Sequence, residues 1–176
     1  TNGHPLMLEL SRGAEIINAG DVQKYVLEEF LVNLNNTERK LLDYISVFRY
    51  PITEKMACPS QSTLMSIAAK GILQELPGNR YQLHDVIKSH LYNAQRKSRL
   101  LSHHSRAADY YLEQGDEQSL LETVFHRIRA EQFDLAAEIA IGYRDILCNN
   151  GNSGELTGLV SEIFEKCPDM DKDTLT

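Results

Sequence analysis

The 176-residue sequence predicts a mainly α-helical protein that contains a winged helix-turn-helix with a small β-hairpin wing. Between residues 35 and 95, helical apolar patterns are interrupted by prolines and followed by two short strand-like runs, which is the element order of a winged helix. On both sides of this segment, apolar residues recur only at helical spacing. We therefore expect N-terminal helices at 1–34, a winged-helix domain at 35–95 and an α-helical hairpin array at 96–176.

The N-terminal part is expected to hold two helices. Pro5 suits the first turn of a helix, because its fixed φ is helical and its missing N–H is not needed there. Asp21 can cap the second helix. The apolar face of that helix is formed by Val22, Val26, Leu27, Phe30, Leu31 and Leu34.

The winged-helix part begins with Asn35 and Glu38 at the spacing of a capping box, followed by a helix that carries an apolar stripe. Pro51 and Pro59 break the chain around a short segment at 53–57, and a further helix is expected from Ser60 to Gly71. Residues 72–76 and 80–83 read as two strands joined by a turn with Gly and Asn, which tolerate positive φ. Asp85 is expected to cap the next helix.

Only helices are expected after residue 96. One ends at Gly115, the next two are expected to be capped by Asp116 and Asp134, and the last runs from Ser153 to a stop at Pro168. Leu120, Phe133 and Ala136 suit positions of a tetratricopeptide-like repeat, whereas Arg127 stands where that repeat expects an aromatic residue.

Composition and charge narrow the function classes. With 42% apolar and 24% charged residues, the chain is an ordinary globular protein, and no apolar run approaches the ~20 residues that cross a bilayer. We expect a cytoplasmic protein without a membrane partner, with Cys58, Cys148 and Cys167 as reduced thiols. The chain begins at Thr1 without an initiator Met, which suggests a piece of a larger protein.

Enzymatic activity is not expected from this chain alone. It has no GxxxxGK[ST] phosphate loop, so it cannot by itself hydrolyse a nucleotide as a P-loop protein does. The six histidines include no pair three or four residues apart that would share a helix face, so no metal site is predicted.

DNA binding is the first function that a winged helix suggests, because its second principal helix usually enters the major groove. The residues available for it are few: Gln61, Ser62, Lys70 and, on the wing, Arg80. The net charge is −7, although residues 37–96 carry eight basic and five acidic side chains. Phosphate binding is therefore disfavoured, and a winged-helix DNA-binding regulator is kept as the alternative function.

His84 and Asp85 stand where a strand becomes a helix. The simplest interpretation is that Asp85 caps the helix while His84 ends the strand half-buried. A second interpretation is an anion site, because the free N–H groups at a helix N-terminus favour negative charge and a neighbouring histidine can donate to a phosphate. The residues themselves do not decide between the two.

Several segments resemble the STAND class of signalling ATPases, which includes the NB-ARC proteins. "TNGHPL" is similar to the GxP motif that opens the helical lid of that family, here Gly3 and Pro5. "LLDYISVFRYPI" and "LQELPGNRYQLHDVIKSHL" resemble its winged-helix domain, and "HHSRAADYYLEQG" resembles the first helix of its sensor array. The resemblance covers roughly residues 1–111 and is only architectural beyond them.

The resemblance implies a nucleotide switch. The dipeptide at His84 and Asp85 matches the family's "MHD" motif, with Leu83 in place of Met. By this likeness His84 contacts the β-phosphate of ADP, Asp85 supports the helix start, and Pro5 packs near the adenine.

The same resemblance implies the chain's partners and cofactors. The implied cofactor is ADP or ATP in the full-length protein, and no cofactor is expected in this piece. The implied partners are the chain's own upstream nucleotide-binding domain and a protein that binds the C-terminal helices. A scaffold without any link to nucleotide remains a third hypothesis.

Overall fold

The computed structural model describes residues 31–56, 61–149 and 153–167. Its elements are α3 (Asn36–Ile45), β1 (Ile52–Thr53), α4 (Gln61–Ala69), β2 (Leu73–Leu76), β3 (Arg80–Leu83), α5 (Asp85–Ala94), α6 (Lys97–Gln114), α7 (Glu117–Arg129), α8 (Phe133–Gly142), α9 (Arg144–Asn149) and α10 (Ser153–Lys166). The predicted mainly helical class with a small antiparallel sheet is confirmed. The helices expected over 1–30, with Gly3 and Pro5, lie outside the described residues.

The winged-helix-like unit comprises α3 to α5 and begins at the predicted capping box. The Asn35 side-chain oxygen accepts a hydrogen bond from the Glu38 N–H at 2.9 Å, and the Asn35 N–H donates to the Glu38 carboxylate at 2.8 Å. Two N–H groups that the start of α3 would leave unpaired are thereby satisfied. The same face of α3, one and two turns further along, buries Leu42 and Ile45 in the core.

The sheet is antiparallel, with the strand order β1-β3-β2. The predicted hairpin of β2 and β3 is confirmed, and its turn places Gly78 at φ 82° and Asn79 at φ 54°. Strand β1 was not predicted: the sequence indicated only a short segment at 53–57 between two prolines. Two residues are too few to show a strand pattern, and it is the pairing of Ile52 with Tyr81 that makes this segment a strand.

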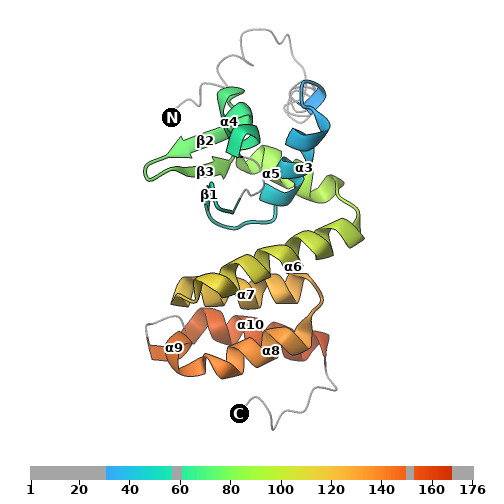
Figure 1. Ribbon diagram of the computed structural model, residues 1–176. Helices are drawn as coiled ribbons and strands as arrows, with labels where there is room; N and C mark the ends of the chain where they lie inside the picture. The colour runs from blue at the N-terminus through green and yellow to red at the C-terminus, as the bar shows by residue number, and fades with distance from the viewer. Residues whose placement is uncertain (1–30, 57–60, 150–152, 168–176) are drawn as a thin grey trace, which may run out of the picture.

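The helical array below this unit is joined to it by α6, which lies between the two parts (Figure 1). Helix α6 ends at Gly115, which takes the left-handed conformation at φ 70°, and the Asp116 side chain then accepts from the Ser119 N–H at 3.1 Å to start α7. Both boundaries were predicted. A second core lies among α7, α8, α9 and α10 and contains Leu120, Val124, Ala136, Leu147, Leu159 and Ile163.

Two details of the array differ from the prediction. Asp134 does not cap α8: the tight turn after α7 puts Glu131 at φ 58°, so the helix already starts at Phe133 and Gln132 holds the cap position. Asp134 lies instead in the first turn of α8. The six-residue helix α9 was also not anticipated, because so short a segment gives little periodicity.

Arg127 stands at the position where the repeat pattern expects an aromatic residue. Its side chain is buried between helices, where it donates to the Asp109 carboxylate at 2.6 Å and to the Gln132 side-chain oxygen at 2.7 Å. The aliphatic stem of Arg127 is thus buried as an aromatic ring would be, while hydrogen bonds hold the guanidinium.

Helix α6 contributes to both cores. Its Ala107 and Tyr111 belong to the same buried cluster as Phe48, Tyr81 and other residues of the winged-helix-like unit. Its partly buried Leu112 packs against the core of the array. Within the described ranges, no helix is both long and apolar enough to cross a membrane.

The capping box at Asn35 generates a stability prediction. Replacing Asn35 with Ala should lower the free energy of unfolding by about 1 kcal/mol, because the N–H of Glu38 loses its acceptor. The measurement is urea unfolding followed by far-UV circular dichroism. Asn93→Ala, on an exposed position of α5, is the matched control and should change stability by less than about 0.5 kcal/mol. Equal losses in the two variants would contradict the capping role.

Candidate functional site

His84 occupies the corner between β3 and α5. Its backbone has φ −58° and ψ 135°, its carbonyl accepts from the Lys88 N–H at 2.8 Å, and its side chain is half-buried. The prediction that Asp85 caps α5 is wrong, because β3 runs to Leu83 and a single residue turns the chain into the helix. His84 therefore holds the cap position, without a side-chain cap hydrogen bond, and Asp85 lies exposed in the first turn.

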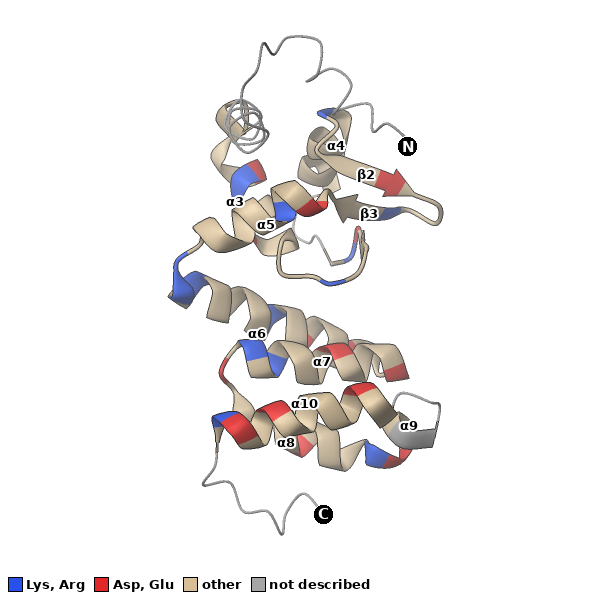
Figure 2. Cartoon of the chain, turned by 180° about the vertical axis from the view of Figure 1, so that it is seen from behind, with Lys and Arg blue, Asp and Glu red and all other residues tan. Residues whose placement is uncertain are grey.

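Helix α4 is the element that would enter a DNA groove. Its sequence contains no charged residue, and Figure 2 shows it almost without blue or red. Lys70, just after its end, is bound to the Glu38 carboxylate at 2.7 Å and to the Asn33 carbonyl at 3.2 Å. These contacts occupy the ammonium group that a phosphate would need.

The remaining DNA candidates are similarly placed. The Gln61 side chain donates to the Glu54 carboxylate at 2.6 Å, and the Arg80 Nε donates to the Pro77 carbonyl at 3.1 Å. Ser62 is exposed in the first turn of α4. The four residues lie on one unit, and the side chains of Gln61, Lys70 and Arg80 are engaged in hydrogen bonds within it.

The Glu38 carboxylate that holds Lys70 is itself well stabilised. Hydrogen bonds from Lys70, Ser66 and the Asn35 N–H lower its pKa from 4.5 to about 2. The group therefore stays ionised over the physiological range, and the tie between α3 and α4 persists there.

A buried carboxylate is paired with a cation where the winged-helix-like unit meets the array. Arg49, in the loop between α3 and β1, donates through its Nε to the two carboxylate oxygens of Glu122 at 3.0 and 3.2 Å, and its Nη2 forms a further short bond to the same carboxylate. The Nη2 also contacts Glu155 of α10 at 2.6 Å. Glu122 is fully buried in α7. One guanidinium thus joins the loop, α7 and α10, and we call this group the Arg49 joint.

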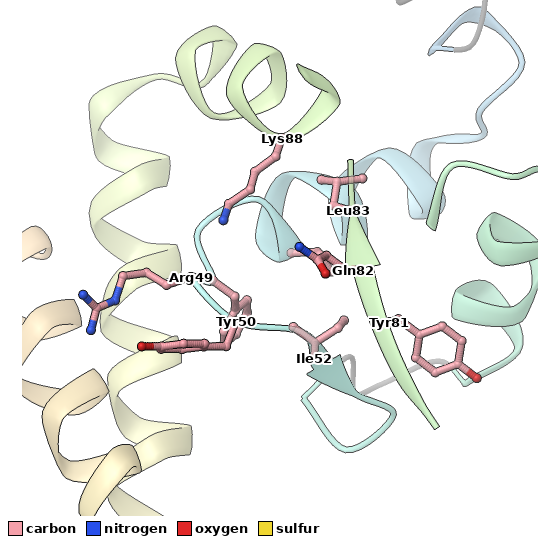
Figure 3. A pocket seen from close by; sticks show the side chains of 9 residues that line it. Arg49, Tyr50, Ile52, Tyr81, Gln82, Leu83 and Lys88 are labelled. Carbon is pink, nitrogen blue, oxygen red and sulfur yellow. The ribbon is translucent and has the colours of Figure 1, made fainter. Parts of the chain in front are cut away.

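Aromatic rings cover one side of the Arg49 joint. The Arg49 guanidinium lies 4.1 Å from the centre of the Phe125 ring, and Phe48 packs against Tyr111 of α6 with ring centres 5.9 Å apart. Figure 3 shows Arg49 reaching from the loop toward the array, while Lys88 points from α5 into the small pocket beside it. Burial raises the pKa of the Glu122 carboxyl, and the bonds from Arg49 oppose this rise.

A chain of aromatic and polar side chains lies beside the Arg49 joint. The Tyr92 hydroxyl of α5 is 3.1 Å from His104 Nε2, and His104 Nδ1 is 2.8 Å from His126 Nδ1. His126 Nε2 faces a Glu122 carboxylate oxygen at 3.8 Å, which is too long for a hydrogen bond. The sequence had suggested scattered histidines, but these two residues, 22 apart along the chain, are in contact.

A second set of contacts fixes the start of α6 on α3. Gln95 donates to the Asp43 carbonyl and to the Ser46 hydroxyl, each at 3.0 Å, and its side-chain oxygen accepts from His103 Nδ1 at 2.8 Å. Arg99 pairs with the Asp43 carboxylate at 3.0 Å. The beginning of the array is therefore bonded directly to the winged-helix-like unit.

The C-terminal helices, for which the sequence predicts a protein partner, carry a shallow apolar hollow. It lies among α6, α7 and α8, and its lining includes Leu112, Leu135, Ile139 and Tyr143. Leu135 and Tyr143 are about 40% exposed, at 42% and 39%. In the part of the chain that is described, no group of three or more His, Cys, Asp or Glu side chains is arranged to hold a metal ion.

Sequence reasoning did not anticipate the Arg49 joint. Arg49 is 73 residues from Glu122 and 106 from Glu155 along the chain. A single arginine after an amphipathic helix and two glutamates on later helices are ordinary surface patterns. The one available signal was that Glu122 falls among Leu120, Leu121 and Val124, on an otherwise apolar stretch.

Comparison of the sequence with protein-family models and with curated proteins finds no match. Comparison of the structure with solved structures finds the crystal structure of a Signal Transduction ATPase with Numerous Domains (STAND) protein with a tetratricopeptide repeat sensor, from Pyrococcus horikoshii. The TM-score is 0.66 with 20% sequence identity, and the alignment covers 95% of this chain and 26% of that protein. The match establishes a shared fold over nearly the whole chain, which spans about a quarter of the length of that protein.

The Arg49 joint generates a second stability prediction. Arg49→Ala should lower the free energy of unfolding by about 2 to 3 kcal/mol, because it leaves the buried Glu122 carboxylate without a cation. The loss of stability relative to the unmutated chain should be smaller at pH 5 than at pH 8. Burial already raises the pKa of Glu122, so its carboxyl takes up a proton more readily, and a protonated carboxyl needs no cationic partner. Urea unfolding at both pH values measures this.

Arg129→Ala is the matched control for Arg49→Ala. Arg129 also lies over the Phe125 ring, at 5.0 Å, but its carboxylate partner Glu162 is at the surface of the array. We expect a loss below about 1 kcal/mol, as for other exposed ion pairs. An equal loss in both arginine variants, at both pH values, would show that the burial of Glu122 does not matter.

Proposed function

We propose that this chain is the regulatory part of a nucleotide-switched, STAND-type signalling ATPase. In this proposal the winged-helix-like unit docks on a nucleotide-binding core, and the helical array senses a protein partner. The chain itself is not an enzyme, and the parent protein supplies the ATPase domain and its ADP or ATP. The observation that carries the proposal is the fold likeness, over 95% of the chain, to part of a STAND protein with a tetratricopeptide repeat sensor.

The His84 corner supports the docking half of the proposal. A half-buried imidazole at the cap position of α5, beside the N–H groups of the first helical turn, suits contact with an anion held by another domain. His84 would contact the β-phosphate of ADP, while Asp85 in the first turn would stabilise the positive end of the helix. Gly3 and Pro5 would contribute the lid side of the same nucleotide site.

The array supports the sensing half. The hollow among α6, α7 and α8 exposes Leu135 and Tyr143, which suits an apolar segment of a protein partner. Because the Arg49 joint connects α7 and α10 to the loop after α3, a partner that shifts these helices would also shift the winged-helix-like unit. A ligand that binds one arrangement better than the other biases the switch by that difference in affinity.

DNA binding by the winged-helix-like unit is the alternative function, and the structure of α4 weighs against it. The ammonium group of Lys70 is held by Glu38, so binding a phosphate requires breaking a pair with a carboxylate that is 1% exposed. Helix α4 itself carries no cation.

Binding to random duplex DNA at several salt concentrations separates the two functions. Regulatory docking predicts no binding above background at 50 mM salt, and Lys70→Ala should leave that result unchanged. A DNA-binding regulator predicts an affinity that falls steeply with salt, with a slope that Lys70→Ala reduces by about 1. The measurement is fluorescence anisotropy of a labelled duplex, and a steep slope would replace the proposed function with the alternative.

Nucleotide retention in the longer protein tests the role of His84. His84→Ala should release bound ADP faster, by about tenfold. A hydrogen bond to a charged group contributes about 1.5 to 3 kcal/mol, and water replaces part of that contribution when the imidazole is removed. His90→Ala, on the same helix, is the control and should leave the rate unchanged. If both variants retain ADP as the unmutated protein does, the chain is a scaffold without a nucleotide link.

A further inference from the structure

The two buried histidines beside the Arg49 joint form a defined pair. His104 is 1% exposed and His126 is fully buried, with their Nδ1 atoms 2.8 Å apart. At that distance one Nδ1 carries a proton and the other accepts it, because two protonated nitrogens could not approach so closely. The pair therefore shares one hydrogen bond, and because burial lowers the pKa of both imidazoles, the docked pair is neutral near pH 7.

The neighbours of the pair favour one direction for that hydrogen bond. If His104 donates through Nδ1, its Nε2 is free to accept from the Tyr92 hydroxyl, and His126 must carry its own proton on Nε2. That N–H then faces the Glu122 carboxylate at 3.8 Å. In the opposite arrangement the lone pair of His126 Nε2 would face the carboxylate, which is repulsive. The protons therefore run in one direction, from Tyr92 through the two histidines toward Glu122.

The pair is shielded by both parts of the molecule. Both histidines lie on the α6–α7 hairpin, but Tyr92 of α5 and Phe48 of the loop after α3 cover them from the winged-helix-like unit. The Phe48 and His126 ring centres are 5.7 Å apart. Removing that unit from the hairpin would expose both imidazoles to water.

We infer that the His104–His126 pair makes the contact between the winged-helix-like unit and the helical array sensitive to protons, so that acidification releases the unit while both parts stay folded. An additional proton goes to one of the two ring nitrogens that accept a hydrogen bond. On His126 Nδ1 it would face the N–H of His104, whereas on His104 Nε2 it faces the Tyr92 hydroxyl and removes the acceptor that α6 offers to α5. Proton uptake at His104 Nε2 therefore weakens the contact with the winged-helix-like unit and is favoured when the two parts separate. This inference does not depend on the nucleotide proposal.

The charges around the histidine pair also disfavour proton uptake in the docked state. The titratable and charged groups that face it from the surrounding elements are Arg49 from the loop, Lys88 and Tyr92 from α5, His103 and Tyr111 from α6, Glu122 and Arg129 from α7, and Glu155 from α10. Burial lowers the pKa of His104 to about 4, and the nearby cations add to this effect. Burial also lowers the pKa of His126, with the neighbouring His104 as the next cause. Glu122 is the anion closest to the pair, but Arg49 neutralises it.

The sign of the pH effect follows from these pKa values. In the separated state the first imidazole to take up a proton has an ordinary pKa of about 6.5, whereas in the docked state burial lowers the pKa of both imidazoles, so the separated state binds more protons. Docking is fully favourable above about pH 7 and weakens as the pH falls through 6.5 toward 4. At pH 5 the separation constant should rise about 30-fold relative to pH 8 for the first proton taken up, while the second proton adds less because the two histidines stay side by side on the α6–α7 hairpin.

The test combines small-angle X-ray scattering with far-UV circular dichroism on the unmutated chain from pH 8 to pH 4. We expect the radius of gyration to increase with a midpoint between pH 6.5 and 4 while the helical signal is retained. The double variant His104→Gln with His126→Gln should lose this transition, because glutamine can hydrogen-bond but does not titrate. His90→Gln, a histidine on α5 outside the pair, should behave as the unmutated chain.

Three results would overturn the inference: an increase in size that coincides with loss of helix, a transition that persists in the double variant, or a size that stays constant over the whole range. If the double variant does not fold, ¹⁵N NMR of the imidazoles in the unmutated chain at pH 7.5 decides. The expected tautomers are Nδ1–H for His104 and Nε2–H for His126. The reversed tautomers, or a protonated pair at that pH, would contradict the proton chain on which the inference rests.

Discussion

The ion pair between Arg49 and Glu122 is the interaction on which the arrangement of the two parts depends. A carboxylate with no exposure to solvent is costly to bury, and its cost is offset only where a cation reaches it with suitable geometry. The cation comes from the winged-helix-like unit, and the carboxylate comes from the array. The array therefore keeps its buried charge balanced only while the unit is docked in this position.

Helix α6 explains why the two parts behave as one body in this arrangement. Tyr111 completes the core of the winged-helix-like unit, and Leu112, one residue later, packs against the core of the array. A helix shared in this way transmits displacement rather than absorbing it, since neither core can lose its face of α6 without opening a cavity. The Arg49 joint and the histidine pair add polar contacts at the same boundary.

The polar side chains near that boundary divide into two kinds. Gln95, just before α6, and Arg99, in its first turn, are partly exposed and bind the backbone and the Asp43 side chain of α3. Those deeper in, His104, His126 and Glu122, are buried and depend on one another for hydrogen bonds or charge balance. The first kind sets the position of the helix, whereas the second kind makes the boundary responsive to protonation, because buried groups change energy strongly when their charge changes.

The sequence alone determined several helix and turn boundaries: the capping box at Asn35, the turn before Arg80 and the end of α6 at Gly115. These were predictable because cap hydrogen bonds and positive φ depend on residues only a few positions apart. The sequence also placed His84 at a strand-to-helix corner, although it suggested the wrong cap. Only the tertiary structure decided that β1 is a strand and that Arg49, Glu122 and the two histidines meet. Those contacts join residues far apart in the chain, and their energies arise from burial and pairing that exist only after the helices have packed.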